Sequence, residues 1–215
     1  NMVHPLSPQI RGILDGSVNP RPLLITGINT GVGHNDDKAE RAAKVSDAVF
    51  HNNLASYVER GGRAGHCHFY LPNGVDQNLF AARSLPSERP RRALWMGSEL
   101  HAEHKGLEIM RGIAGELNRE HGIELDLFVA DSTATPKTPA EMCDWYNSGR
   151  VFVVASKSEG TPNPALEAAS CGCAIVSTCV GNMPELICDF GARRSGVLVR
   201  REPRPILNGI VFAME

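Results

Sequence analysis

The sequence predicts an α/β fold with two units, each a parallel sheet covered by helices. Three observations predict it. Apolar runs of strand length alternate along the chain with segments of helical character, an order that favours parallel strands joined by covering helices. The alternation pauses at a polar segment with two prolines, residues 84–92, and then restarts. The run from Val151 to Ala155 is entirely apolar, as suits a parallel strand buried on both faces.

The composition excludes several classes of protein. Of the 215 residues, 42% are hydrophobic and 21% are charged, which suits a globular core rather than a disordered chain. A formal net charge of −2 offers no bulk field for nucleic acid or an anionic membrane. No apolar run approaches the ~20 residues that span a bilayer, and the first residues lack the pattern of a signal sequence. We therefore expect a cytoplasmic protein with no transmembrane segment and no nucleic-acid partner, peripheral membrane association being the alternative.

The first unit, residues 1–83, begins with an irregular stretch and then alternates strands with helices. A loop after its first strand has glycines at positions 27, 31 and 33, which lack the GxGxxG spacing of a phosphate-binding loop. We interpret them as turn glycines. Predicted strands lie at residues 23–26, 47–51 and 67–71, and predicted helices at residues 39–45 and 54–60.

The second unit, residues 93–215, repeats this order. Its long amphipathic helix is predicted to open at Lys105 and to end at Gly122, because apolar residues recur between them at helical spacing. A loop follows at residues 132–138. The other predicted helices lie at residues 139–147, 164–170, 184–187 and 206–214. The predicted strands lie at residues 93–96, 125–129, 151–155, 174–180 and 196–199.

The clearest chemical signal comes from residues 156–168, where the buried strand ends and a helix begins. In open α/β sheets, ligands bind at the carboxyl ends of the strands. Asn163 is expected to be the N-cap of this helix and Pro164 its first residue. The first backbone N–H groups of the helix then point toward the loop, which makes them a ready site for phosphate.

Two glutamates flank this helix start. Glu159 lies in the loop and Glu167 lies one turn into the helix. A carboxylate accepts hydrogen bonds from vicinal hydroxyls, so carboxylates on both sides of an anion-binding helix end suit a ligand with hydroxyls at both ends and phosphate between. A nucleoside diphosphate sugar is such a ligand. The alternative is that Glu167 only complements the helix dipole, whereas Glu159 caps nothing obvious.

The region after Ser158 resembles the signature of the family-4 retaining glycosyltransferases, which belong to the glycosyl transferases group 1 and have the GT-B fold. That signature is a Glu-x7-Glu pair, a small-residue helix, a Cys-Gly turn, an apolar strand and a Gly-x-x-Pro-Glu turn. The corresponding residues here are Glu159 and Glu167, Ala168-Ala169, Cys171-Gly172, 174–176, and Gly181 with Pro184-Glu185. Two further blocks are similar to family motifs, and they extend the resemblance to roughly residues 40–200: 71–76, and Met96-Gly97 followed by Lys105-Gly106.

The resemblance implies two Rossmann-like domains with parallel sheets, the first incomplete and the second nearly complete. Residues 1–83 would be the C-terminal part of an N-terminal, acceptor-side domain, and residues 84–92 a linker. Residues 93–215 would be a C-terminal domain that binds the nucleotide sugar and is truncated at its end. A fragment of a longer protein is the favoured interpretation, and a reduced natural protein is the alternative.

The implied activity is transfer of a hexosyl group from a UDP-, GDP- or ADP-sugar to an acceptor hydroxyl, with retention of configuration and without a metal or other cofactor. The acceptor would be a glycan, a lipid or a small molecule. By matching position, Glu159 would bind the donor sugar and Lys105 would stabilise the departing diphosphate, where the reaction develops most charge. The donor-binding residues that the resemblance implies are Gly97, Ser98, Gly160, Thr161, Pro162, Asn163 and Glu167.

Two departures from the family pattern leave other functions open. Ser98 stands where members commonly carry an arginine, so the diphosphate lacks one cation unless another, such as Lys157, substitutes. Residues 26–29 contain no histidine, although the family has one facing the donor sugar. The alternative is therefore a non-catalytic nucleotide-sugar-binding module, either a pseudoenzyme or half of a split transferase. An epimerase of nucleotide sugars would share the fold, but the Glu-x7-Glu pair argues against it.

The six cysteines and the histidine clusters carry no strong signal. Without a signal sequence, reduced thiols are the default, and Cys171 and Cys173 are expected to pack as small apolar residues. The clusters His66-Cys67-His68 and His101 with His104 lack a further ligand motif for a transition metal. We therefore expect neither a metal site nor a disulfide framework.

Overall fold

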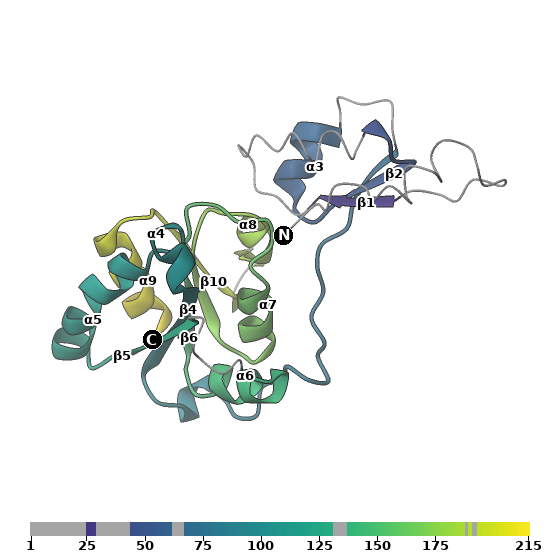
Figure 1. Ribbon diagram of the computed structural model, residues 1–215. Helices are drawn as coiled ribbons and strands as arrows, with labels where there is room; N and C mark the ends of the chain where they lie inside the picture. Colours follow the sequence, from purple (N-terminus) through teal and green to yellow (C-terminus); the bar gives the residue numbers. More distant parts are fainter. Residues whose placement is uncertain (1–24, 29–43, 62–66, 131–136, 188, 191–192) are drawn as a thin grey trace. The chain divides into compact units, whose positions relative to one another are not determined.

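The computed structural model describes residues 25–28, 44–61, 67–130, 137–187, 189–190 and 193–215 of the chain (Figure 1). The chain divides into two compact units, Asn1–Pro72 and Asn73–Glu215. Each unit contains a parallel sheet, which confirms the α/β fold predicted from the alternation of apolar runs.

The first unit contains a three-stranded parallel sheet of order β1-β2-β3. Its elements are β1 (Ile25–Ile28), β2 (Ala48–His51), α3 (Leu54–Gly61) and β3 (Cys67–Tyr70). The last three lie within a residue of their predicted ends, and β1 runs two residues past its predicted end. The helix predicted at 39–45 falls almost wholly outside the described residues.

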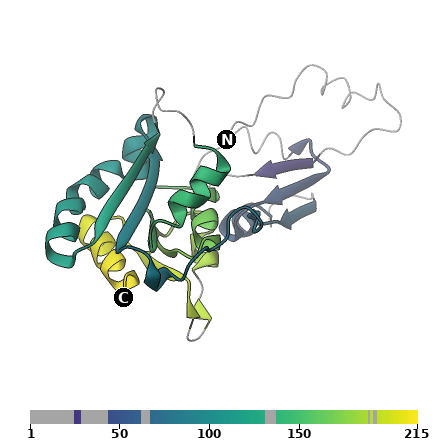
Figure 2. The ribbon, with the colours of Figure 1, turned by 90° about the horizontal axis from the view of Figure 1, so that it is seen from below.

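The second unit is built on a five-stranded parallel sheet of order β10-β7-β6-β4-β5 (Figure 1, Figure 2). Its strands, all predicted, are β4 (Arg92–Ser98), β5 (Glu124–Ala130), β6 (Val151–Val154), β7 (Ala174–Thr178) and β10 (Gly196–Val199). The larger helices are α5 (Leu107–His121), α6 (Pro139–Tyr146), α7 (Asn163–Ser170) and α9 (Pro203–Ala213). The short elements are η1 (Pro86–Glu88), η2 (Glu99–His101), α4 (Ala102–Lys105), α8 (Met183–Leu186), and an antiparallel pair that the sequence does not predict, β8 (Asp189–Phe190) with β9 (Arg193–Arg194).

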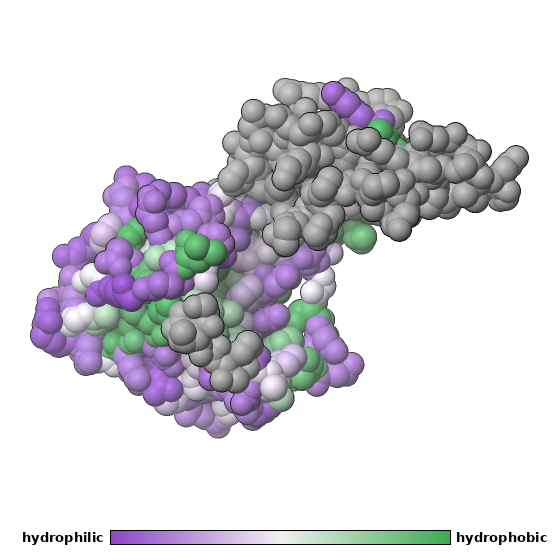
Figure 3. All heavy atoms as spheres, in the orientation of Figure 1, coloured by the Kyte–Doolittle hydropathy of each residue, from purple (hydrophilic) through white to green (hydrophobic). Residues whose placement is uncertain are grey.

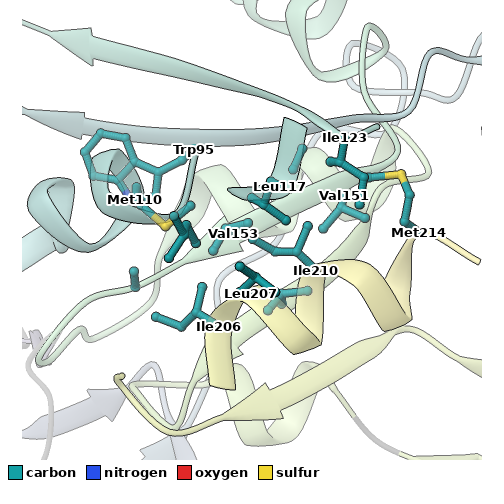
Figure 4. Packing of buried hydrophobic residues seen from close by; sticks show 14 of the residues in the cluster. Trp95, Met110, Leu117, Ile123, Val151, Val153, Ile206, Leu207, Ile210 and Met214 are labelled. Atoms are coloured by element: carbon teal, nitrogen blue, oxygen red, sulfur yellow. The ribbon is translucent and has the colours of Figure 1, made fainter. Parts of the chain in front are cut away.

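Helices cover both faces of this sheet, and the alternation of side chains along each strand decides which layer a residue joins. In β4, Ala93 and Trp95 pack with α5 and α9, whereas Leu94 packs with α6 and α7. Figure 4 shows the first of these layers, where helix side chains close over Trp95, Val151 and Val153. All four residues of β6 are buried, as its unbroken apolar run predicts.

The prediction that the long helix opens at Lys105 is wrong. Lys105 is the last residue of α4, and Gly106, with φ of +84°, separates it from α5, which begins at Leu107. A left-handed backbone favours glycine, and a Cβ at this position would lie 2.5 Å from the carbonyl oxygen of Ala155. The break leaves Lys105 at a helix end, close to the residue that follows β6.

Residues 73–92 lie in the second unit, which differs from the predicted boundary at residues 84–92. The reason is visible at Arg89, whose side chain is charged although the residue is only 3% exposed. Its guanidinium donates hydrogen bonds to three carbonyl oxygens, those of Ser84, Gly149 and Cys171. These bonds fasten the polar, proline-containing segment to the second unit, so its composition does not mark a free linker.

The described part of the chain contains no helix with both the length and the apolar character needed to cross a membrane. Its longest helix, α5, has 15 residues, fewer than the ~20 that span the hydrocarbon core. The face of the second unit seen in Figure 3 is largely hydrophilic, with smaller hydrophobic patches between the polar side chains.

Helix α6 begins with a reciprocal cap. Thr138 Oγ1 accepts a hydrogen bond from the Glu141 amide at 3.3 Å, and the Glu141 carboxylate accepts one from the Thr138 amide at 2.7 Å. Replacing Thr138 by alanine should lower the free energy of unfolding by about 1 kcal/mol, because an amide of the first turn loses its acceptor. Urea denaturation followed by circular dichroism measures this loss. Thr138→Ser keeps the hydroxyl and should retain most of the stability, so an equal loss in both variants would contradict the capping explanation.

Candidate functional site

Two side chains predicted from separate motifs form an ion pair at the carboxyl ends of β4 and β6. Lys105 Nζ lies 2.5 Å from Glu159 Oε1, and the two side chains are 30% and 14% exposed. Ser156 Oγ donates a second hydrogen bond to the same oxygen at 2.7 Å. Two donors thus hold a carboxylate that is largely withdrawn from water, and they offset the cost of removing its charge from water. The structure brings together two candidate catalytic residues that are 54 positions apart in the chain.

The loop that carries Glu159 is fastened on two sides. On one side, His104 Nε2 donates to the carbonyl oxygen of Ser158 at 2.7 Å. On the other side, Thr178 Oγ1 donates to the carbonyl oxygen of Ser156 at 2.8 Å. Because these donors belong to α4 and β7, the position of the carboxylate depends on segments that precede and follow the loop in the chain.

The turn after β7 packs directly on this loop. Gly181 has φ of +52°, and its backbone approaches so closely that an added Cβ would overlap the carbonyl oxygen of Gly160. The amide of Asn182 donates to that same oxygen at 3.1 Å. Glycine is therefore required at position 181 for two reasons: the backbone is left-handed there, and it lies too close to Gly160 for a side chain.

The prediction that Asn163 caps α7 is wrong. Asn163 is the first residue of the helix, and Pro162 holds the cap position without a side-chain hydrogen bond. The carboxamide oxygen of Asn163 instead accepts a hydrogen bond from Asn73 Nδ2 at 2.9 Å. Thr161 and Pro162 are buried, while Asn163 is exposed. The Asn163 side chain therefore forms a hydrogen bond with a residue 90 positions away and does not cap its own helix.

Glu167 lies one turn into α7, as predicted, and is tied to α6. The buried hydroxyl of Tyr146 donates to Glu167 Oε2 at 2.8 Å. Burial raises the pKa of the Glu167 carboxyl, and the hydrogen bond from Tyr146 opposes this rise. Burial and the nearby carboxylate raise the pKa of the Tyr146 hydroxyl, so it stays protonated and acts as the donor.

Glu167 also lines a hollow of about 340 Å³ on the surface of the second unit. Its other lining residues are Asn73, Gly74, Val75, Asp76, Phe80 and Asn163. This volume is within the usual range of small-molecule sites. Carboxylates, carboxamides and one aromatic ring meet there, a combination that can bind hydroxyl groups and an apolar edge of the same ligand.

Gly97 and Ser98 end β4 beside Lys105. Gly97 is buried, and an added Cβ would overlap the ring of Trp95 and lie 3.2 Å from the Cβ of Lys105. The indole Nε1 of Trp95 donates to the carbonyl oxygen of Lys105 at 3.3 Å. Ser98 is half-buried at the last position of the strand. The small residue at 97 thus lets a core tryptophan support the segment that carries Lys105.

Lys157, considered from sequence as a substitute cation, forms an exposed ion pair with Glu103. Arg201 also connects α4 to the end of β6, because its guanidinium donates hydrogen bonds to the carbonyl oxygens of Glu103 and Ala155. Lys157 is therefore part of the contact between α4 and the loop after β6, with its charge directed at a carboxylate.

The packing expected of Cys171 and Cys173 is confirmed. Cys143, Cys171 and Cys173 are buried free thiols, and burial raises the pKa of Cys171 and of Cys173 to about 12. Within the described residues, one cluster could hold a metal ion, and it lies on the surface of α5. It consists of Glu116, Glu120 and His121. His104 serves instead as a hydrogen-bond donor in the loop contact described above, and His66 lies outside the described residues.

Several residues with contacts in this site were not predicted as site residues, among them Asn73, His104, Tyr146, Ser156 and Thr178. Ser156 directly follows the buried strand, so its position at a carboxyl end was a usable signal. The others act through partners distant in the chain, and the sequence gives no sign of those contacts, although Asn73 lies in the block 71–76 that resembles a family motif.

A family model described as Glycosyl transferases group 1 matches residues 92–215. Among curated proteins, the chain is similar to a D-inositol 3-phosphate glycosyltransferase of Acidothermus cellulolyticus, 31% identical over 133 residues, covering 56% of this chain and 29% of that protein. A second protein of that name, from Streptomyces bingchenggensis, is 29% identical over 160 residues, covering 68% and 34%. The chain thus spans about a third of the length of the curated relatives it matches.

Solved structures show the same likeness. Sucrose-phosphate synthase from Thermosynechococcus elongatus aligns with a TM-score of 0.60 at 17% identity, covering 96% of this chain and 56% of that one. TarM from S. aureus, in a complex that includes UDP, aligns with a TM-score of 0.68 at 11% identity, covering 90% and 44%. At such identities the likeness shows a shared fold and no more.

Proposed function

Because the chain belongs to the glycosyl transferases group 1 family, whose model spans more than half of it, we propose that its second unit is the nucleotide-sugar half of a retaining glycosyltransferase. The unit has the fold of the GT-B glycosyltransferases. The observation that carries the proposal is the ion pair of Lys105 with Glu159 beside the start of α7. A donor sugar diphosphate could bind both members of this ion pair. Its phosphates would attract the ammonium group of Lys105, and its hydroxyls would donate hydrogen bonds to the carboxylate of Glu159.

In the proposed reaction a hexosyl group passes from a nucleoside diphosphate to an acceptor hydroxyl with retention at the anomeric carbon. The C1–O bond to the diphosphate breaks, and the acceptor oxygen bonds to C1 on the same face of the sugar. The departing diphosphate takes the acceptor proton, so no protein nucleophile is assigned. Lys105 balances the charge that develops on the diphosphate, and the proposal includes no metal. Glu159 orients the sugar, and Glu167 accepts hydrogen bonds from the ribose hydroxyls.

The backbone of the loop, Gly160 to Asn163, together with Gly97 and Ser98, completes the proposed donor site. Gly160 has no side chain to keep the diphosphate away from its backbone. We assign the first unit to the end of an acceptor-side domain, in keeping with its parallel sheet. The named activity of the relatives makes D-inositol 3-phosphate the first acceptor to test.

A second function, a binding module without turnover, is favoured by one observation. Ser98 brings no charge to the diphosphate, and Lys157 directs its charge at Glu103. Such a module would bind a nucleotide sugar and never consume it, so a turnover assay with donor and acceptor separates the two functions.

The proposal is tested by nucleotide binding to this chain. UDP, GDP, ADP and their hexose conjugates are titrated in thermal-shift and calorimetric experiments, and one nucleotide should stabilise the protein with saturation. Glu167→Ala should weaken that binding about tenfold, about 1.4 kcal/mol, because the ribose hydroxyls lose a charged acceptor. Glu124→Ala, an exposed glutamate at the other end of the sheet, is the matched control and should bind as the unaltered chain does. Absence of binding by every nucleotide, or full binding by Glu167→Ala, would refute the donor site.

A further inference from the structure

We propose that Tyr146 is a positioning residue for the donor site: its buried hydroxyl fixes the Glu167 carboxylate in the orientation that receives the ribose hydroxyls. This inference rests on the proposed function, because it assumes that the ligand of Glu167 is a nucleotide. It adds a residue that the family motifs do not contain and that lies on a different helix from the Glu-x7-Glu pair.

The ring of Tyr146 is held firmly enough to act as a fixed donor. Tyr146 is fully buried and makes ring contacts on several sides, with centroid separations of 6.0 Å to Phe80, 5.3 Å to Trp145 and 5.8 Å to Phe152. A side chain packed in this way has few alternative rotamers. Its hydroxyl therefore stays at one point, 2.8 Å from Glu167 Oε2.

A single hydrogen bond to one carboxylate oxygen suits the proposed role. A carboxylate can accept about four hydrogen bonds through its two oxygens, so the bond from Tyr146 restrains the group and leaves capacity for two vicinal hydroxyls. Glu167 lines the hollow described above, which gives a ligand access to it. Because the Glu167 side chain is already restrained in the free protein, less side-chain entropy is lost when the ligand binds.

The hydrogen bond also favours the ionised form of Glu167, which is the better acceptor. Burial raises the pKa of this carboxyl, and the bond from Tyr146 opposes that rise. The other titratable groups near the pair are Asp76, which lines the same hollow, and Cys171 and Cys173, which face Tyr146. Arg89 faces the two thiols. All four are unchanged in a Tyr146 variant, so a comparison with the unaltered chain isolates the effect of the hydroxyl.

The test is Tyr146→Phe, which removes one oxygen and keeps the ring. Binding of the nucleoside diphosphate that the unaltered chain prefers, from UDP, GDP and ADP, is measured by calorimetry from pH 5 to pH 8. At pH 7.5 the variant should bind about tenfold more weakly, equivalent to about 1.4 kcal/mol. Ionised Glu167 is the binding form, so affinity is lost as pH falls through its pKa. Without the Tyr146 bond that pKa is higher, so the loss should begin at higher pH in the variant.

Two further variants separate positioning from a general structural effect. Tyr57→Phe makes the same chemical change in the first unit and should leave affinity and pH profile unaltered. Glu167→Gln keeps an acceptor for Tyr146 and removes the charge, so its binding should be weaker, and the part of the pH dependence that comes from the Glu167 carboxyl should disappear. If Tyr146 acts through Glu167, adding Tyr146→Phe to Glu167→Ala, which has no acceptor left for Tyr146, should change affinity less than twofold.

Two results would overturn the inference. One is an unchanged affinity and pH profile in Tyr146→Phe, and the other is an equal loss of affinity with and without Glu167→Ala, which would indicate a change in packing. Either result leaves the proposed function intact, because the unaltered chain still binds its nucleotide. If the unaltered chain binds none of the three nucleotides, the proposed function and the inference fail together.

Discussion

For the proposed glycosyl transfer, replacing Lys105 by alanine should lower kcat by about 10²–10³-fold, with a smaller change in KM. The ammonium group is proposed to balance charge that appears on the diphosphate only as the glycosidic bond breaks, and removing one fixed donor to a developing charge has this magnitude. Lys105 is 30% exposed and paired to a carboxylate that is 14% exposed, so water replaces its charge poorly. Lys105→Arg keeps the charge and should retain more activity than the alanine variant. Initial rates with saturating donor and acceptor measure the effect.

The control for Lys105 is the other lysine in this region. Lys157 is exposed and paired with exposed Glu103, so Lys157→Ala should change kcat less than threefold, as expected for a surface pair that contributes little. A second readout needs no turnover: Lys105→Ala should weaken binding of the nucleoside diphosphate and leave binding of the bare nucleoside unchanged. Comparable losses in the two alanine variants, or a kcat of Lys105→Ala within fivefold of that of the unaltered chain, would contradict the proposed role.

Replacing Gly181 by alanine should lower the free energy of unfolding of the second unit by about 3 kcal/mol. A left-handed backbone costs a non-glycine residue about 1–2 kcal/mol, and forcing an added methyl group into a packed site costs about 1–3 kcal/mol. At Gly181 both apply, because φ is +52° and the new Cβ would overlap the backbone oxygen of Gly160. The same displacement of Gly160 should weaken nucleotide binding. Urea denaturation and calorimetry measure the two effects.

The matched control is Gly112, in the middle of α5. An added Cβ there has no atom within 4 Å, so Gly112→Ala should be neutral or stabilise the helix by about 0.5–1 kcal/mol. If Gly181→Ala proves as stable as Gly112→Ala, the close contact between the two turns is not a constraint, and the explanation of the Gly-x-x-Pro-Glu turn is wrong.

The elements that the sequence predicts well are those whose burial is local in origin. An unbroken apolar run predicts β6 because both faces of a parallel strand are covered, and helical spacing predicts the buried residues of α5, Leu107, Met110, Ile113 and Leu117. The start of that helix was misplaced because a spacing pattern does not register the left-handed turn at Gly106. The β8–β9 pair was missed because two strands of two residues each have no period to detect.

The candidate site was predictable to the extent that motifs mark carboxyl ends of strands. Lys105 and Glu159 were named from sequence, and the structure adds that they form an ion pair. Their roles in transfer, like those of the donor-binding residues, stay predictions. The misplaced cap at Asn163 and the missed hydroxyl of Tyr146 have one cause, namely partners that only the folded chain brings near, at Asn73 and Glu167.

The order of the strands also links the proposed nucleotide binding to the stability of the sheet. β4 pairs with β5, the next strand along the chain, but β6 must return to the other side of β4 before Lys105 and Glu159 can meet. A nucleotide that contacts both Lys105 and Glu159 therefore binds only when β6 is paired with β4. By mass action, its binding favours the chain in which these strands are paired. At a free concentration one hundred times its Kd, such a ligand adds about 2.7 kcal/mol to the free energy of unfolding. The donor would then hold the two halves of the sheet in register while it serves as substrate.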